Sequence, residues 1–142
     1  MPLPLPEREV FLSQPHVAAL SVGRSAPGRA PLSVPVWYWY EPGHDLWLMT
    51  GRDSVKAKAI AAAGCVTLLV ERLEPTIRYV SVEGPVVSRE PSTPEEMKAL
   101  AFRYLPAEKV EDYLRVAQHE QGPQITVRIR PEHWLSADLG TV

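Results

Sequence analysis

The most informative stretch of this sequence is residues 46–60, LWLMTGRDSVKAKAI. It begins as an apolar strand, breaks at Thr50-Gly51 and continues as a short Ala-rich helix. A hydroxyl and three cations gather around the start of that helix: Arg52, Ser54, Lys56 and Lys58. A helix start presents unpaired backbone N–H groups and the positive end of the helix dipole, so basic side chains there favour a phosphate site. The alternative interpretation is a solvated, basic helix face that follows a strand.

Residues 32–40, just upstream, give the strongest strand pattern in the chain. Leu32, Val34, Val36, Tyr38 and Tyr40 fall on one face, and Ser33, Pro35, Trp37 and Trp39 fall on the other. Pro35 cannot donate a hydrogen bond to a neighbouring strand, which predicts an edge, a bulge or a ligand-facing position. The aromatic residues of 37–40, together with Trp47, are typical of a core or a dimer interface, and alternatively of a surface that stacks on a flat ligand.

The rest of the chain alternates short strands with helices. Strands are expected at 16–23, 46–49, 65–70, 76–88 and 124–130, with a bend or bulge at Gly84-Pro85. Helices are expected at 7–14 and 54–63, from Pro94 onward and at 107–119. With the strand at 32–40, this makes six strands, joined mostly by short turns. The pattern predicts one mainly β (α+β) domain over residues 1–142, built as a six-stranded antiparallel barrel with peripheral helices.

Composition excludes several classes of protein. The chain of 142 residues is 45% hydrophobic and 23% charged, which is ordinary for one globular domain. Its net charge of −2 argues against a nucleic-acid partner. No apolar run approaches the roughly 20 residues that span a bilayer, so no membrane partner is expected. The N-terminal residues lack the features of a signal peptide, which predicts a cytoplasmic location.

No side chain stands out as catalytic or metal-binding. The four histidines lack the spacing of metal ligands, and no Ser lies in a Gly-x-Ser-x-Gly context. Cys65, the one cysteine, sits in an apolar run and is expected to be a buried, inert thiol. Glu83 could act as a base, but a strand Glu more commonly faces water or pairs with Arg. We therefore predict no catalytic side chain and no metal site, which favours a bound cofactor or no catalysis.

Several short motifs follow one another in a characteristic order. They are residues 16–22 (HVAALSV), 27–29 (PGR), 34–38 (VPVWY), Thr50 with 54–56 (SVK), 65–70 (CVTLLV) and 78–84 (RYVSVEG). Over residues 8–131 this order resembles the pyridoxamine 5′-phosphate oxidase-like split β-barrel superfamily. It is most similar to the small flavin- and deazaflavin-dependent reductases of that superfamily.

The resemblance implies a six-stranded split barrel that forms a homodimer. It also implies a cofactor in a groove between the subunits, either the 8-hydroxy-5-deazaflavin coenzyme F-420, which we favour, or FMN. Lys56 matches the basic residue that meets the cofactor phosphate, with Thr50, Gly51 and Ser54 beside it. The strand that borders the flat ring matches Val34, Pro35, Val36 and Trp37. Arg52 and Lys58 are expected as second contacts to a phosphate or a polyglutamate tail.

The function that follows from the resemblance is hydride transfer to or from a small organic substrate, with the cofactor supplying the chemistry. Oxidation of pyridoxamine phosphate itself is not expected, because nothing in the sequence supplies its contacts. An alternative is a non-catalytic flavin or deazaflavin carrier or sensor with the same fold. A further alternative is a structural dimer whose site has decayed, since Val55 and Ala59 replace residues common in the relatives.

Overall fold

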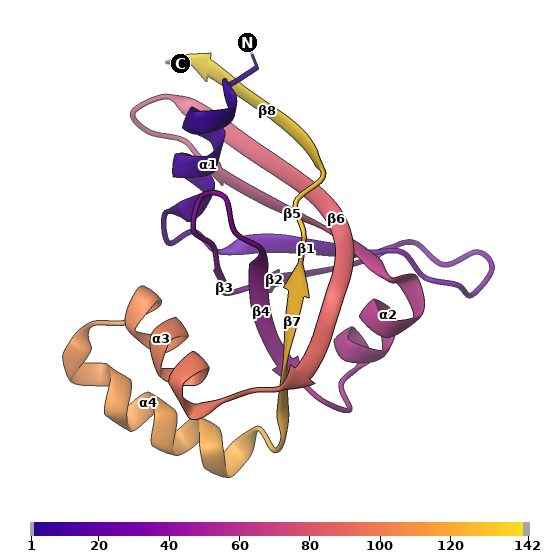
Figure 1. The fold of residues 1–142 in the computed structure, drawn as a ribbon, viewed down its shortest axis with the longest axis vertical. Helices are drawn as coiled ribbons and strands as arrows, with labels where there is room; N and C mark the ends of the chain where they lie inside the picture. The colour runs from indigo at the N-terminus through magenta and orange to yellow at the C-terminus, as the bar shows by residue number, and fades with distance from the viewer. Residues whose placement is uncertain (1, 141–142) are drawn as a thin grey trace.

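A computed structural model describes residues 2–140 of the chain, which contain four helices and eight strands (Figure 1). The helices are α1 (Leu5–Ser13), α2 (Val55–Ala63), α3 (Pro94–Tyr104) and α4 (Ala107–Glu120). The strands are β1 (Ala18–Val22), β2 (Leu32–Val36), β3 (Tyr38–Trp39), β4 (Leu46–Gly51), β5 (Cys65–Arg72), β6 (Ile77–Pro91), β7 (Gln124–Ile129) and β8 (His133–Gly140). The single domain expected over residues 1–142 therefore includes three residues, 1 and 141–142, that lie outside the described range.

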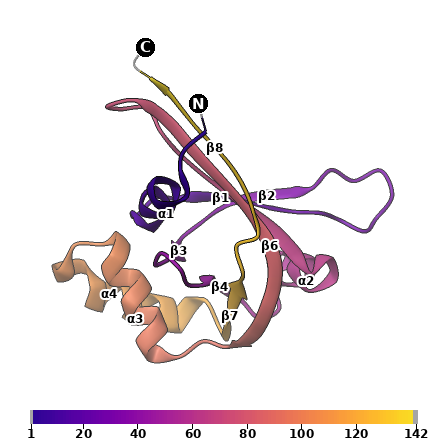
Figure 2. The ribbon, with the colours of Figure 1, turned by 45° about the horizontal axis from the view of Figure 1, so that its top comes forward.

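The strands form one antiparallel sheet in the order β2-β1-β5-β6-β7-β4-β3, and β8 pairs with β6 beside that path. β6 joins the two halves of the sheet, because it pairs with β5 and β8 up to Pro85 and with β7 from Val86 onward. The sheet curls around this long strand into a half-barrel. In two views α2 lies on one side of β4 and β7, and the α3–α4 pair lies on the other (Figure 1 and Figure 2).

The prediction of six strands was wrong by two. The segment 32–40 is not one strand, because β2 pairs with β1 whereas β3 pairs with β4, and the chain changes partner at Trp37. The second extra strand is β8, whose mixed sequence HWLSADLG pairs with β6 from His133 to Gly140, with one register shift near its end. The expected irregularity in β6 is present, but the register shift falls between Val86 and Ser88 rather than at Gly84-Pro85.

Gly84 is required by a close approach of two backbone segments. A Cβ atom built at this position would lie 1.7 Å from the carbonyl oxygen of Arg130. Arg130 lies in the connection between β7 and β8, and its N–H donates to the Pro85 carbonyl at 3.1 Å. The turn from β7 to β8 can therefore cross β6 only where β6 has no side chain.

The core fills the inside of the curl. Residues that alternate along the strands are fully buried there, including Leu20, Leu48, Leu68, Val80 and Val127. The predicted alternation in 32–40 is confirmed, since Val36, Tyr38 and Tyr40 are buried. The prediction of a buried thiol was wrong, because Cys65 is exposed. β5 turns Val66, Leu68 and Val70 toward the core, so its odd-numbered positions face outward.

The α3–α4 pair is fixed to the rest of the fold through α3. The predicted start of a helix at Pro94 is confirmed, and a capping box between Thr93 and Glu96 stabilises this end of α3. At the other end, the Tyr104 hydroxyl donates to the His16 carbonyl at 2.7 Å and accepts from the Tyr38 N–H at 3.1 Å. The Arg103 guanidinium donates to the Ser13 carbonyl at 2.8 Å. None of the helices within residues 2–140 is both long enough and apolar enough to cross a membrane.

Candidate functional site

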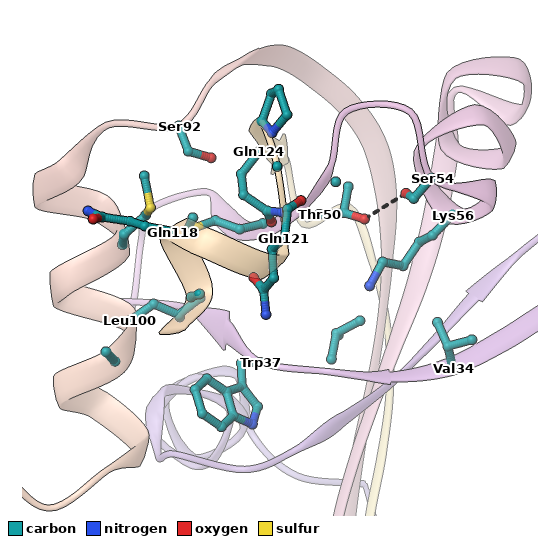
Figure 3. A pocket seen from close by; sticks show the side chains of 18 of the residues that line it. Val34, Trp37, Thr50, Ser54, Lys56, Ser92, Leu100, Gln118, Gln121 and Gln124 are labelled. Atoms are coloured by element: carbon teal, nitrogen blue, oxygen red, sulfur yellow. Dashed lines mark hydrogen bonds between the residues drawn. The ribbon is translucent and has the colours of Figure 1, made fainter. Parts of the chain in front are cut away.

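A cavity of about 930 Å³ lies between edge strand β2, the junction of β4 with α2, and the α3–α4 pair (Figure 3). Its volume is near the upper end of the range of roughly 300–1,000 Å³ that is usual for small-molecule sites. Eight of the ten residues predicted to bind a cofactor line it: Val34, Pro35, Val36, Trp37, Thr50, Gly51, Ser54 and Lys56.

A polar corner of the cavity forms where β4 ends and α2 begins. Ser54 caps the helix, since its Oγ accepts the Ala57 N–H at 3.0 Å. The Ser54 Oγ also lies 3.0 Å from the Oγ1 of buried Thr50, so the last turn of β4 and the helix start are held together. Ser54, Val55 and Lys56 at the start of α2 line this corner, and the N-terminal end of a helix favours an anion.

Lys56 supplies the charge of this corner. Among the residues that line the cavity, it has the one charged side chain. It is half-buried and forms no salt bridge with any residue in the range 2–140. Desolvation by burial lowers the pKa of the Lys56 ammonium below its ordinary value. An ammonium that is partly removed from water without a carboxylate partner favours the approach of an anionic ligand.

The other two predicted cations lie outside the cavity. Arg52 is exposed and forms an ion pair with neighbouring Asp53 at 3.3 Å. Lys58 is exposed on α2, two positions after Lys56, and residues two apart on a helix do not share a face. Neither residue therefore lines this cavity. Their expected contact with a second phosphate or a polyglutamate tail stays a prediction.

Strand β2 forms a second wall. It is the end of the sheet order, which agrees with the edge position that Pro35 predicted, and Pro35 itself lines the cavity. Trp37 follows at the break between β2 and β3. Its ring stacks on Tyr104, with centroids 4.8 Å apart and planes 13° apart, and it tilts against Tyr113 at 5.5 Å. An aromatic surface held from both helices thus adjoins an edge strand.

The third wall was not predicted from the sequence. It consists of residues from α3, α4, the turn that follows and the start of β7: Met97, Leu100, Ala101, Tyr113, Leu114, Ala117, Gln118, Gln121 and Gln124. In α4 these positions recur at intervals of three and four, so the amphipathic spacing of residues 113–121 was an available signal. The cavity lining contains no carboxylate, histidine or cysteine. Within residues 2–140 no group of His, Cys, Asp or Glu is arranged to hold a metal ion.

The sequence matches no protein-family model and no curated protein. Solved structures do match, and three with TM-scores of 0.60–0.65 illustrate them. An F420 reductase is 23% identical, with 89% of this chain and 94% of that chain covered and a TM-score of 0.65. An FAD-binding protein from Mesorhizobium loti is 17% identical (97% and 95% covered, TM-score 0.62). A candidate pyridoxamine 5′-phosphate oxidase from Listeria innocua is 14% identical (93% and 96% covered, TM-score 0.60).

At these identities the similarity establishes the fold. The chain shares the fold of these proteins, with its antiparallel sheet curled as in a split β-barrel, so the resemblance stated from the sequence motifs is confirmed at the level of the fold.

Proposed function

We propose that this protein is a flavin- or deazaflavin-dependent oxidoreductase that binds its cofactor phosphate at Lys56. The observation that carries the proposal is the unpaired, half-buried ammonium of Lys56 at the start of α2, inside a cavity with no other charged side chain. Such a group is expected to bind a phosphate, and Ser54 and Thr50, whose hydroxyls contact each other, line the same cavity.

The remaining walls fit a flat, largely apolar ring system. The edge of β2 offers backbone N–H and C=O groups, and the rings of Trp37 and Tyr113 offer apolar faces. Met97 and Leu100 close the far side with apolar groups. The names of the structural relatives, an F420 reductase and an FAD-binding protein, agree with a cofactor of this shape.

When bound, a cofactor of this class supplies hydride transfer. The residues of the chain then have simple tasks. Lys56, Ser54 and Thr50 would hold the phosphate, the β2 edge would border the ring, and the α3–α4 wall would keep water from the cavity. The lining residues include no general acid or base other than Lys56 and Tyr113, which suits chemistry carried out by the cofactor.

The experiment that tests the proposal is titration of the purified protein with the deazaflavin coenzyme F-420 and with FMN, followed by absorbance. We favour the deazaflavin and expect saturable binding of at least one cofactor. Reduced cofactor is then offered to a panel of small organic hydride acceptors. Turnover supports an oxidoreductase, tight binding without turnover supports a carrier or sensor, and no binding of either cofactor contradicts the proposal.

The proposal includes a cytoplasmic location and a homodimer. The homodimer is supported by the outer face of the sheet. The outer face of the sheet carries an uncharged row across five strands: Pro35, Ala19, Leu69, Ser81 and Leu135. Leu69 is 40% exposed and Leu135 is 64% exposed, although both are apolar. The row ends at Pro35, which also lines the cavity. A second copy that covered this row would therefore reach the cavity, as expected for a groove between subunits.

A further inference from the structure

The two helices that wall the cavity are attached to the rest of the fold in different ways. α3 has polar contacts at both ends. The Glu96 carboxylate accepts hydrogen bonds from Thr126 and Arg128 of β7. Arg103 and Tyr104 donate to backbone carbonyls of the segment between α1 and β1. α4 has no equivalent: among residues 2–140, no hydrogen bond or salt bridge joins it to another helix or to a strand, and its one ion pair lies within the helix.

Packing also holds α4 only in part. In this helix, which the structure describes in full, Val110 is the one buried side chain. α4 runs beside α3 in two views (Figure 1 and Figure 2). Near its middle, the ring of Tyr113 lies 5.5 Å from the ring of Trp37, at a tilt of 36°. An aromatic pair is a modest interaction, so this contact can break and re-form more easily than the ion pair and hydrogen bonds of α3.

Both ends of α4 have the properties of hinges. Leu105 and Pro106, which separate it from α3, are extended, with ψ angles of 150° and 143°. Gly122, just beyond the other end, has a φ of 62°. The chain is fixed again at the next residue, because the Pro123 carbonyl accepts the Arg52 N–H at 2.9 Å. Hinges are usually a few residues at the ends of elements, where changes in φ and ψ are absorbed. A movement of α4 can therefore be confined to the helix and these short connections.

We propose that α4 is a lid on the cavity, which moves away from Trp37 and returns to it while α3 stays in place. Tyr113, Leu114 and Ala117 form the inner face of the lid, since they line the cavity. An open lid lets a small molecule enter and leave, and a closed lid keeps water out. The gating of a cofactor rests on the proposed function, because it needs a cofactor in the cavity. The movement of α4 itself can be measured without one.

The movement is tested by electron–electron distance measurements between two nitroxide labels on the full chain. Cys65 is exposed on β5 and is the one cysteine, so it carries the first label. The second is attached through Val116→Cys on α4 or, as the matched control, through Phe102→Cys on α3. These side chains are 51% and 47% exposed and neither lines the cavity. An excess of unlabelled Cys65→Ser chain keeps both labels of any homodimer in one subunit.

Without cofactor, the distance distribution to position 116 should be at least about twice as broad as that to position 102, as hinge motion of one helix requires. Saturating deazaflavin coenzyme or FMN should narrow it to the width of the α3 control. Equal widths in the free chain would overturn the lid. A cofactor that binds without narrowing the α4 distribution would overturn its gating role.

A hinge variant tests the gating through rates. Pro106→Gly loosens one hinge outside the cavity, and Pro42→Gly is the control at an exposed proline between β3 and β4. The freedom gained allows association and dissociation of the cofactor to rise together by about two- to fivefold in Pro106→Gly, with a nearly constant Kd. Stopped-flow fluorescence of the cofactor measures both rates. Unchanged rates, or equal rises in both variants, would overturn the gating. If neither cofactor binds, the proposed function fails, and the distances in the free chain still decide whether α4 moves.

Discussion

The hydroxyls of Thr50 and Ser54 lie 3.0 Å apart and join the end of β4 to the start of α2. Thr50 is buried, whereas Ser54 caps the helix and lines the cavity. One contact therefore links the stability of the barrel to the shape of the polar corner.

Substitutions of Ser54 should separate these two roles. Ser54→Ala removes the N-cap and should lower the free energy of unfolding by about 1 kcal/mol, measured by urea denaturation. Ser54→Asp keeps a capping oxygen but places a carboxylate beside the expected phosphate, so stability should be retained while cofactor affinity falls about tenfold or more. Unchanged cofactor binding by Ser54→Asp would show that no anion sits at this corner.

Gly84 should tolerate no side chain. Gly84→Ala places a Cβ against the Arg130 carbonyl, 1.7 Å away in the present backbone, and should lower the free energy of unfolding by about 3 kcal/mol or more. Gly23→Ala is the control, because a Cβ there meets nothing within 4 Å and the backbone needs no positive φ. Comparable stabilities of the two variants in urea or thermal unfolding would refute the crossing of β6 by the β7–β8 connection.

The outer row of the sheet should govern assembly. Leu69→Arg places a charge at the centre of the uncharged row and should convert a homodimer into monomers, as measured by light scattering during gel filtration. Leu73→Arg is a control at an exposed leucine just beyond β5 and outside that row. A dimer that survives Leu69→Arg but dissociates with Leu73→Arg would place the interface elsewhere.

Phosphate binding should begin to weaken at a lower pH than it would with a lysine of ordinary pKa. Burial lowers the pKa of Lys56, so the ammonium is charged below that pKa and loses its proton as the pH rises through it. Affinity for FMN or the deazaflavin should therefore fall at a pH below 10.5. Lys56→Arg keeps its charge throughout this range and should abolish the fall. Constant affinity of the unmodified chain up to pH 10.5 would contradict this assignment.

Much of the barrel could be predicted from the sequence, because most of its strands have strong local patterns. Alternation in 32–40 predicted the buried face of Val36, Tyr38 and Tyr40, and a helix was predicted from Pro94 onward, where α3 begins. The two extra strands depend instead on partners far away in the chain. Trp37 marks a change of partner that local alternation does not register, and β8 has a mixed sequence that becomes a strand only beside β6.

One part of the candidate site could likewise be predicted from the sequence, and the other part could not. Thr50, Ser54 and Lys56 lie within seven residues of one another, so their association was visible in the sequence. The opposite wall comes from α3 and α4. The spacing of residues 113–121 predicts that one face of α4 is covered, but it does not show that this face lines a cavity. Which side chains of a helical pair face a cavity is decided by how the pair docks. Here Tyr104, bonded to His16 and Tyr38, contributes to that docking.

The central claim is that Lys56 holds the phosphate of a flavin-type cofactor, and Lys58 on the same helix is its matched control. The decisive measurement is the dissociation constant of the deazaflavin coenzyme and of FMN for the unmodified chain, Lys56→Ala and Lys58→Ala. Loss of a charge-assisted contact should weaken binding by about ten- to a hundredfold in Lys56→Ala. Lys58→Ala should bind nearly as well as the unmodified chain, because Lys58 lies outside the cavity. Full affinity in Lys56→Ala, or an equal loss in both variants, would contradict the claim.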